Sequence, residues 1–390
     1  MSWTSPRTWG QDRRVGLLLL AVAAGTNVPT PLLLVYRDEL GMSDTSLTAL
    51  FGVYALGLAP ALAFAGPAAD RWGRRWVAIP AALLSVLASV LYVGAQDSEL
   101  LLYVVRLVQG AGAGATFSVG SAWLVECALR DGKRSGPRTA AVTMTAGFGI
   151  GPAMAGVIGE WGPWPLVLPY LLHAAGLLLA VVAAWTVTET LKRPRVHHEG
   201  RRPGAFRPGR RGFAALVIAP LAVCVYAFPA TAVAGVPVLI GFPSAPVALT
   251  GLLAGAALGT GALAAPLQQR LGARTAPAAA ACGVVGLAGT AIAAAVPPLL
   301  LLAIPSAIIL GAGGGLALVA GLSRLPAVAS EGRLGTVSAA FYSVAYLGFA
   351  MPVALASLSM VVDIVVPLAL LAIVCALLMV QQARARSFDQ

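Results

Sequence analysis

Charged residues are scarce in this 390-residue chain. Asp, Glu, Lys and Arg together make up only 11% of it, whereas 58% of its residues are hydrophobic. Such a composition leaves too little polar surface to coat a water-soluble globule, but a bilayer solvates apolar side chains directly. Together with a mean hydropathy of +0.85, it excludes a soluble protein and predicts an integral membrane protein.

Cysteine is also scarce, and no group of residues has the spacing of a catalytic or metal site. The cysteines stand singly in apolar segments, so no disulfide framework is predicted. They are Cys127, Cys224, Cys282 and Cys375. His197 and His198 beside Glu199 have no further ligand nearby and belong to a solvated stretch. No nucleophile–base pair or phosphate-binding loop occurs, so we expect no enzyme, no metal and no ATPase activity of the chain's own.

Long apolar runs are abundant instead. Crossing a hydrocarbon core takes roughly 20 apolar residues of helix, and twelve runs reach about that length. They are 15–36, 46–69, 76–95, 99–124, 139–160, 164–187, 213–235, 246–268, 276–296, 299–322, 334–358 and 364–381. The first run resembles a signal peptide, but eleven more follow, so we expect it to be retained. The runs predict an all-α membrane protein with twelve transmembrane helices.

Positive charge is confined to one set of loops. Of the 26 Lys and Arg residues, all but Arg37 and Arg106 fall in the termini or in the loops after even-numbered runs. Because cytoplasmic loops carry an excess of Lys and Arg, both termini are expected to be cytoplasmic in a plasma or inner membrane. The net charge of +11 then reflects topology and attraction to anionic membrane lipids, and no nucleic-acid partner is expected.

The longest polar stretch divides the chain into two similar parts. Residues 188–212 are rich in Arg, Pro and Gly and are predicted to form an extended linker. It separates a six-helix bundle at 1–187 from another at 213–390. Residues 50–75 align with 249–274, which indicates an internal duplication. The sequence therefore predicts two pseudo-symmetric bundles with a substrate site between them near the bilayer midplane.

Three motifs connect the chain to a known family. The pattern G66-x-x-x-D70-R71-x-G73-R74-R75 matches the signature loop between spans 2 and 3 of the major facilitator superfamily. The pattern R106-x-x-Q109-G110 in span 4 is similar to the second motif of that superfamily. In span 5, "GFGIGPAMAG" resembles the motif of its twelve-span drug/proton antiporter branch, with Gly147, Gly151, Pro152 and Gly156 as the expected gating-helix residues. This resemblance covers essentially the whole chain and implies the major facilitator fold.

The first motif has a local and a long-range interpretation. Gly73 permits a tight turn and the arginines meet lipid phosphates, but this leaves Asp70 unexplained. The resemblance implies a latch, in which Asp70 faces a helix N-terminus of the other half and an arginine pairs with Glu126. The expected latch residues are Asp70, Arg71, Gly73, Arg74, Arg75 and Glu126. We expect this cluster to stabilise the outward-facing state.

Arg106 is the one basic residue well inside a predicted span. An unpaired arginine there would cost several kcal/mol, so it needs a partner. Three roles stay open: binding an anionic group of a substrate, assisting proton transfer, and hydrogen bonding to backbone carbonyls. In span 1, Pro29 and Pro31 remove two backbone donors and are predicted to bend the helix beyond Asn27.

Polar and aromatic side chains near mid-depth predict the wall of a substrate cavity. The expected residues are Asn27, Tyr54, Arg106, Gln109, Met144, Tyr226, Phe228, Tyr342 and Tyr346. A mainly apolar pocket with hydroxyl tips suits a small amphipathic organic molecule. Spans 1, 5, 7, 8, 10 and 11 have no Asp or Glu in their middle thirds, so a coupling proton would have to be carried by Asp38, Asp70 or Glu126.

These observations predict a secondary transporter that exports a small amphipathic compound by alternating access, in exchange for protons and without a bound cofactor. Uptake or facilitated diffusion of a small organic solute is the alternative within transport, because core carboxylates are missing. A receptor or scaffold that does not transport is the alternative of another class. We expect the protein to act as a monomer surrounded by membrane lipids.

Overall fold

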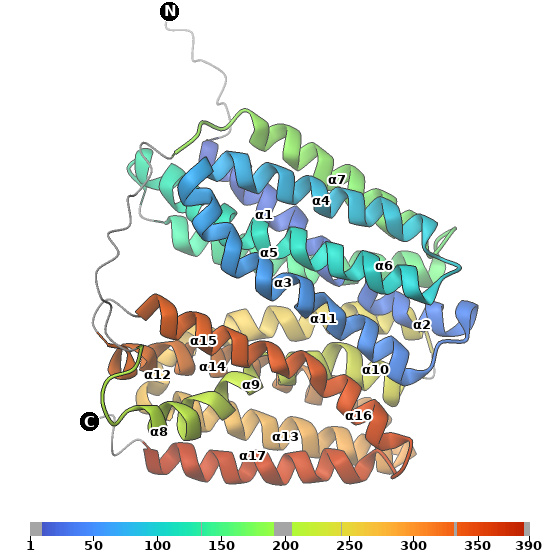
Figure 1. Ribbon diagram of the computed structural model, residues 1–390. Coiled ribbons are helices and arrows are strands. Elements are labelled where there is room, and N and C mark those ends of the chain that lie inside the picture. Colours follow the sequence, from blue (N-terminus) through green and yellow to red (C-terminus); the bar gives the residue numbers. More distant parts are fainter. Residues whose placement is uncertain (1–9, 134, 191–204, 243, 331–333, 386–390) are drawn as a thin grey trace, which may run out of the picture.

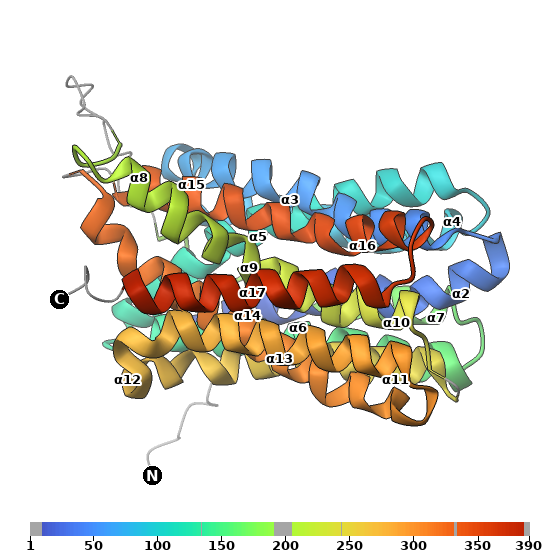
Figure 2. The ribbon, with the colours of Figure 1, turned by 90° about the horizontal axis from the view of Figure 1, so that it is seen from below.

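The computed structural model describes residues 10–133, 135–190, 205–242, 244–330 and 334–385. Within these ranges, twelve helices are long and apolar enough to cross a membrane, as the apolar runs predict. The described residues form no strand, only an isolated bridge between Phe206 and Ala329. The protein is therefore an all-α membrane protein, and its helices form two bundles of six spans (Figures 1 and 2).

Each bundle contains helices from one half of the chain. The first half comprises α1 (Gln11–Asn27), α2 (Pro29–Leu40), α3 (Asp44–Trp72), α4 (Arg74–Gly94), α5 (Glu99–Arg130), α6 (Gly136–Trp161) and α7 (Leu168–Trp185). The second half comprises α8 (Arg211–Phe213), α9 (Ala219–Ala230), α10 (Val236–Leu239), α11 (Pro246–Ala264), α12 (Gln268–Leu271), α13 (Thr275–Ala295), α14 (Ala303–Val328), α15 (Leu334–Tyr346), α16 (Met351–Ser359) and α17 (Val365–Ala385). Several spans are therefore assembled from two or three consecutive pieces, such as α1 with α2 and α15 with α16.

The two ends of the molecule differ in charge. We call the end where α1 begins and α17 ends the terminal face, and the opposite end the distal face (Figure 1). The described basic loop residues, such as Arg74, Arg130 and Arg211, lie at the terminal face, whereas Arg37 lies at the distal end of α2. Exposed tryptophans mark both ends, with Trp72 and Trp185 at the terminal face and Trp161 and Trp164 at the distal face. Such aromatic side chains mark the two membrane–water interfaces.

The duplicated turn appears in both halves. Gly73 links α3 to α4 with φ +108°, and Gly272 follows α12 in the second half with φ +51°. Both angles lie in the region that side chains with a Cβ rarely adopt. The matching glycines therefore serve the same turn at the terminal face of each half.

Residues 188–212, predicted as the linker, are described only at their ends, because 191–204 lie outside the described residues. At the far end of this segment, the N–H of Arg207 donates to the carbonyl oxygen of Val328 at 2.9 Å, and that of Ser330 donates to Ala205 at 3.0 Å. The described end of the segment is therefore attached to the terminal end of α14.

The bundles meet along α6 and α11. The approach is close because glycines lie on both helices: a Cβ on Gly251 would overlap the carbonyl oxygen of Pro152 and lie 2.9 Å from the Cα of Gly156. One helical turn further along α11, a Cβ on Gly255 would lie 2.9 Å from the carbonyl oxygen of Gly149. Small residues at such positions let two helix backbones pack directly in a membrane.

Candidate functional site

A cavity of about 580 Å³ lies between the two bundles. Its wall comes from α1, α3, α5 and α6 of the first half and from α9, α11, α14, α15 and the turns around them in the second half. The lining residues are Thr26, Asn27, Phe51, Tyr54, Leu58, Ala59, Leu62, Ala63, Arg106, Phe117, Met144, Phe148, Tyr226, Pro229, Ala230, Val233, Leu258, Leu318, Tyr342, Ser343, Tyr346 and Phe349. A mainly apolar wall with hydroxyl groups suits an amphipathic organic molecule.

The polar groups of this wall lie beside the interruption between α1 and α2 in the first span. Proline has no N–H group, so Pro29 cannot donate to the carbonyl of Gly25, and α1 ends at Asn27. The Nε2 of Gln109 donates to that carbonyl at 2.7 Å. The Nη1 of Arg106 donates to the carbonyl of Thr26 at 2.8 Å. The second motif thus places two donors on carbonyls at the break.

Arg106 is almost completely buried, with 2% of its surface exposed. Its Nη1 also donates to the Oε1 of Gln109 at 2.7 Å, and the same oxygen accepts the hydroxyl of Tyr92 at 3.2 Å. The guanidinium lies 4.8 Å from the ring centre of Tyr54 and 5.8 Å from that of Phe51. These contacts hold the cation by neutral dipoles and by the electron-rich faces of two rings.

Aromatic rings form the opposite wall. Tyr226 stacks on Tyr346 with ring centres 5.0 Å apart, and Phe349 lies 4.8 Å from Tyr226. Phe349 also reaches the first half, 5.7 Å from Phe51 and 6.4 Å from Tyr54. Rings from both bundles therefore close the distal end of the cavity, directly beside Arg106.

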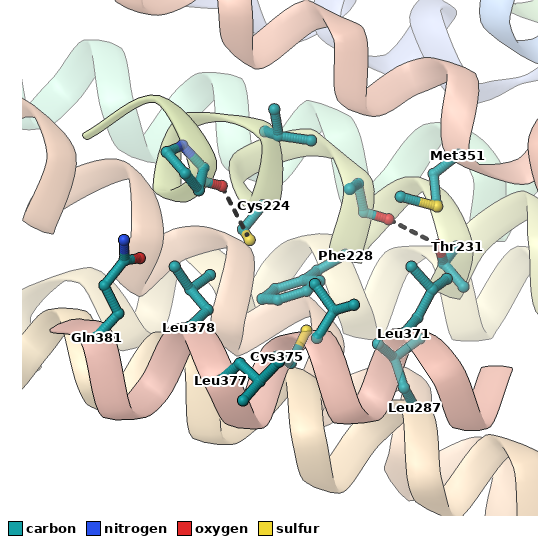
Figure 3. A pocket seen from close by; sticks show the side chains of 14 residues that line it. Cys224, Phe228, Thr231, Leu287, Met351, Leu371, Cys375, Leu377, Leu378 and Gln381 are labelled. Atoms are coloured by element: carbon teal, nitrogen blue, oxygen red, sulfur yellow. Dashed lines mark hydrogen bonds between the residues drawn. The ribbon is translucent and has the colours of Figure 1, made fainter. Parts of the chain in front are cut away.

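Seven of the nine predicted cavity residues line this space: Asn27, Tyr54, Arg106, Met144, Tyr226, Tyr342 and Tyr346. Gln109 is buried behind the wall, where it supports Arg106. Phe228 lies elsewhere. It lines a separate groove of about 570 Å³ between α9 and α17, which includes the exposed Leu377 and so opens to the outer surface (Figure 3). The expectation that Phe228 faces the central cavity is therefore wrong for this conformation.

The predicted gating-helix glycines contact two different helices. A Cβ on Gly147 would collide with Leu20 and Ala23 of α1, and one on Gly151 would overlap the carbonyl of Ala24. Gly156 and the carbonyl of Pro152 face α11 instead. The helix α6 thus lies between a partner in its own half and a partner in the other half, while its role in gating stays a prediction.

The predicted latch cluster gathers at the terminal face. Arg74 pairs with Asp70 at 2.9 Å and with Glu126 at 3.3 Å. Arg71 lies over the ring of Trp72, and Arg75 lies 5.4 Å from the ring of Trp185. All these partners belong to the first half, and among the described residues Asp70 makes no contact with a helix N-terminus of the other half. Its expected contact across the halves stays a prediction for another conformation.

Glu189, which the sequence places at the start of the linker, belongs to this cluster. Its two carboxylate oxygens accept the N–H groups of Arg74 and Arg75 at 3.0 Å each, at the N-terminus of α4. Its neighbour Thr190 donates to Glu126. The sequence contains one indication of this role, because Glu189 is an acidic residue that directly follows a span in an otherwise basic stretch. Asp70 stands in the same kind of position.

We expect Glu189→Ala to lower the free energy of unfolding by about 1 kcal/mol, the usual contribution of a side chain that caps a helix N-terminus. The measurement is chemical unfolding of purified protein in detergent. Glu39→Ala is the matched control, because Glu39 is exposed at the distal end of α2. Equal stability of the two variants would contradict the capping role.

A further acid joins the halves at the distal face. The Oε2 of Glu160, at the end of α6, accepts the N–H groups of Val247 and Ala248 at 2.8 and 3.2 Å, at the N-terminus of α11. Nearby, Arg37 pairs with Asp44 at 2.6 Å and donates to the carbonyl of Val238 in the second half. The sequence alone did not predict this contact.

The contacts between halves are concentrated away from the terminal face. The described polar and ring contacts that join the bundles involve Arg37, Thr45, Phe51, Glu160 and their partners, in the distal half of the molecule. Towards the terminal face the cavity reaches Leu62, Ala63 and Leu318. On the glycine row of α11, Gly259 has nothing within 4 Å of its would-be Cβ, unlike Gly251 and Gly255. Among the residues that the structure describes, the two bundles are thus joined at the distal end and lie further apart at the terminal end (Figure 1).

The sequence model of the family described as Major Facilitator Superfamily matches residues 15–353, which is most of the chain. The chain belongs to the major facilitator superfamily. This family contains transporters, and both the twelve spans and the cavity between two bundles agree with that membership.

Curated relatives within the superfamily match over a shorter region. The chain is 36% identical over 194 residues to the multidrug resistance protein MdtL of Shewanella oneidensis, covering 48% of this chain and 47% of that protein. It is 34% identical over 171 residues to MdtL of Klebsiella pneumoniae, covering 43% and 41%. The matches therefore span less than half the length of these relatives.

Solved structures of the superfamily share the fold across the whole chain. The nucleoside transporter NupG, in the form of a point mutant, superposes with a TM-score of 0.73 at 12% identity and covers 97% of this chain and 99% of its own. The peptide transporter POT, also a point mutant and in complex with sulfate, gives 0.72 at 14%, covering 96% and 94%. At such identities the likeness establishes the fold of the superfamily alone.

Proposed function

We propose that this protein exports a small amphipathic organic compound by alternating access, in exchange for protons. One observation carries the proposal: a mainly apolar cavity lies between the bundles, closed distally by the Phe51–Phe349 contact and continuing towards the terminal face. The resemblance of part of the chain to multidrug resistance proteins supports export. With cytoplasmic termini, for which the basic terminal face argues, this conformation is the one open to the cytoplasm.

A second candidate is movement of the solute without protons, driven only by its own electrochemical gradient. It is favoured by the wall of the cavity, in which no described residue is an Asp or a Glu. Of the three proposed proton carriers, Asp70 and Glu126 pair with Arg74 at the terminal face, and Asp38 is exposed at the distal end of α2. None of the three lines the cavity.

The two candidates are separated with inside-out membrane vesicles from cells with and without the protein. The probes are three fluorescent amphipathic dyes: anionic 8-anilinonaphthalene-1-sulfonate, neutral N-phenyl-1-naphthylamine and cationic ethidium. We expect vesicles with the protein to accumulate at least one dye several-fold above the control. Loss of this accumulation when nigericin collapses the pH gradient supports proton antiport, and its persistence supports the second candidate. Equal accumulation of every dye in both vesicle types would refute export of such compounds.

A further inference from the structure

Arg106 brings a positive charge to the cavity wall, and every described partner of that charge is neutral. These partners are the Thr26 carbonyl, the Gln109 side chain and the rings of Tyr54 and Phe51. The Nε of Arg106 is buried and has no hydrogen-bond partner among the described residues. A buried arginine held in this way retains both a donor and an unbalanced charge.

No described residue of the cavity wall carries a compensating negative charge. The wall includes one arginine, several hydroxyl groups and one amide, and its other members are apolar or aromatic. Coulomb interactions are stronger in such a low-dielectric enclosure than in water. The field of Arg106 therefore favours an anion in the cavity and disfavours a cation.

The remaining wall determines the body of the ligand. Tyr226, Tyr346 and Phe349 present a continuous aromatic surface, and Leu58, Leu62 and Phe117 continue the apolar lining towards the terminal face. Flat rings and apolar chains pack well on such surfaces. A volume of about 580 Å³ falls within the range of pockets for small organic molecules.

We propose that the cavity selects amphipathic organic monoanions, with a carboxylate or sulfonate group on Arg106 and a flat apolar body among the tyrosines. The proposal rests on the proposed function in one respect, namely that this cavity is the transport site. It also gives meaning to the missing acids. A membrane potential of 100 mV, negative inside, holds a monoanion at an outward gradient of about 50-fold, so its export by the second candidate mechanism, without protons, needs no protonatable carboxylate in the core.

The test is a binding comparison that requires no variant. The intact protein is placed in nanodiscs of neutral phosphatidylcholine, and retained ligand is quantified against empty nanodiscs. The probes are 8-anilinonaphthalene-1-sulfonate and N-phenyl-1-naphthylamine, which differ only by the sulfonate. A charge-assisted contact is roughly twice as strong as a neutral one, so we expect the anion to bind at least about tenfold more tightly. Equal or tighter binding of the neutral compound would overturn the proposal.

Variants then locate the preference. Arg106→Gln is expected to abolish the tenfold difference, whereas Arg106→Lys, which keeps the charge, retains part of it. Arg384→Gln, at the end of α17, is the matched loss of an arginine and is expected to leave the difference intact. An undiminished preference in a monodisperse Arg106→Gln protein would contradict the assignment to Arg106.

Two further experiments distinguish this proposal from binding of a lipid headgroup and from failure of the proposed function. If anionic phosphatidylglycerol in the nanodiscs displaces the probe, a lipid headgroup and not a soluble anion occupies Arg106, and the proposal fails. In the vesicle assay, accumulation of ethidium but not of the sulfonate supports export and contradicts anion selectivity. Selective binding of the sulfonate without accumulation of any dye supports the anion site and contradicts the proposed function.

Discussion

Replacing Arg106 with lysine is expected to lower transport at least about 100-fold while the protein remains folded. The guanidinium spans the Thr26 carbonyl and the Gln109 side chain while its face lies over Tyr54. Lysine keeps the charge but has a compact ammonium group without the planar fork, so it cannot make these contacts together. A loss of this size corresponds to roughly 2.7 kcal/mol, comparable to the usual contribution of one or two charge-assisted hydrogen bonds.

Initial transport rates in vesicles that contain equal amounts of protein measure this effect. Size-exclusion chromatography and thermal unfolding in detergent establish whether the fold is kept. Arg384→Lys at the end of α17 makes the same chemical change far from the cavity and is expected to transport like the wild type. If Arg106→Lys transports at the wild-type rate, the prediction is wrong, and the role of Arg106 is limited to stabilising the break in the first span.

Valine at Gly251 and valine at Gly259 are expected to shift the protein in opposite directions. A Cβ at Gly251 would overlap the carbonyl of Pro152, whereas one at Gly259 would meet nothing within 4 Å. Both glycines lie on the row of α11 that faces α6, because residues four apart share a helix face. Gly251→Val should therefore disfavour the described conformation, in which the distal contact is closed. Gly259→Val should be tolerated here and should obstruct closure at the terminal face.

The expected effect is large, because neither backbone can move away without separating the bundles. Overpacking at a tight contact typically costs 1–3 kcal/mol, which changes the ratio of two conformations by about five- to 150-fold. Gly251→Ala and Gly259→Ala provide a graded pair, since the methyl group is smaller. If the two valine variants change the ratio of the two conformations in the same direction, α6 and α11 do not separate at one end of this glycine row.

The apolar runs were sufficient to predict the spans, because a hydrocarbon core demands an unbroken length of apolar helix. The duplicated glycine turn was equally accessible, since Gly73 and Gly272 stand at matching places and both adopt positive φ. The placement of Tyr54, Arg106 and Tyr346 around one cavity was also predictable. Polar side chains near the middle of a span are rare in this protein, and they are expected to face a cavity and not lipid. What these residues do in transport stays a prediction.

The failure at Phe228 has a local cause. Tyr226 and Phe228 both lie in the regular helix α9 and are two residues apart. At 3.6 residues per turn, their side chains point about 200° apart around the helix axis. Because Tyr226 faces the central cavity, Phe228 faces the groove beside α17, and depth in the membrane alone does not distinguish the two faces.

The acids at Glu160 and Glu189 were missed for a different reason. Both accept backbone N–H groups of helices distant in sequence, α11 and α4 respectively. A local pattern does not specify which helix N-terminus lies opposite an acid, because that depends on how the bundles pack. Gln109 could have been placed, since the missing N–H of Pro29 leaves a carbonyl that needs a donor.

The central claim is that two bundles rock about one cavity and close alternately at its two ends. Its most direct measurement is the distribution of distances between spin labels in a variant without the native cysteines. One label pair, at Val142 on α6 and Leu263 on α11, spans the terminal face, and another pair, at Thr45 and Met360, spans the distal face. In Gly251→Val we expect the terminal pair to shift towards shorter and the distal pair towards longer distances, with the reverse in Gly259→Val. A single distribution at each face, unchanged by either variant, would contradict the account.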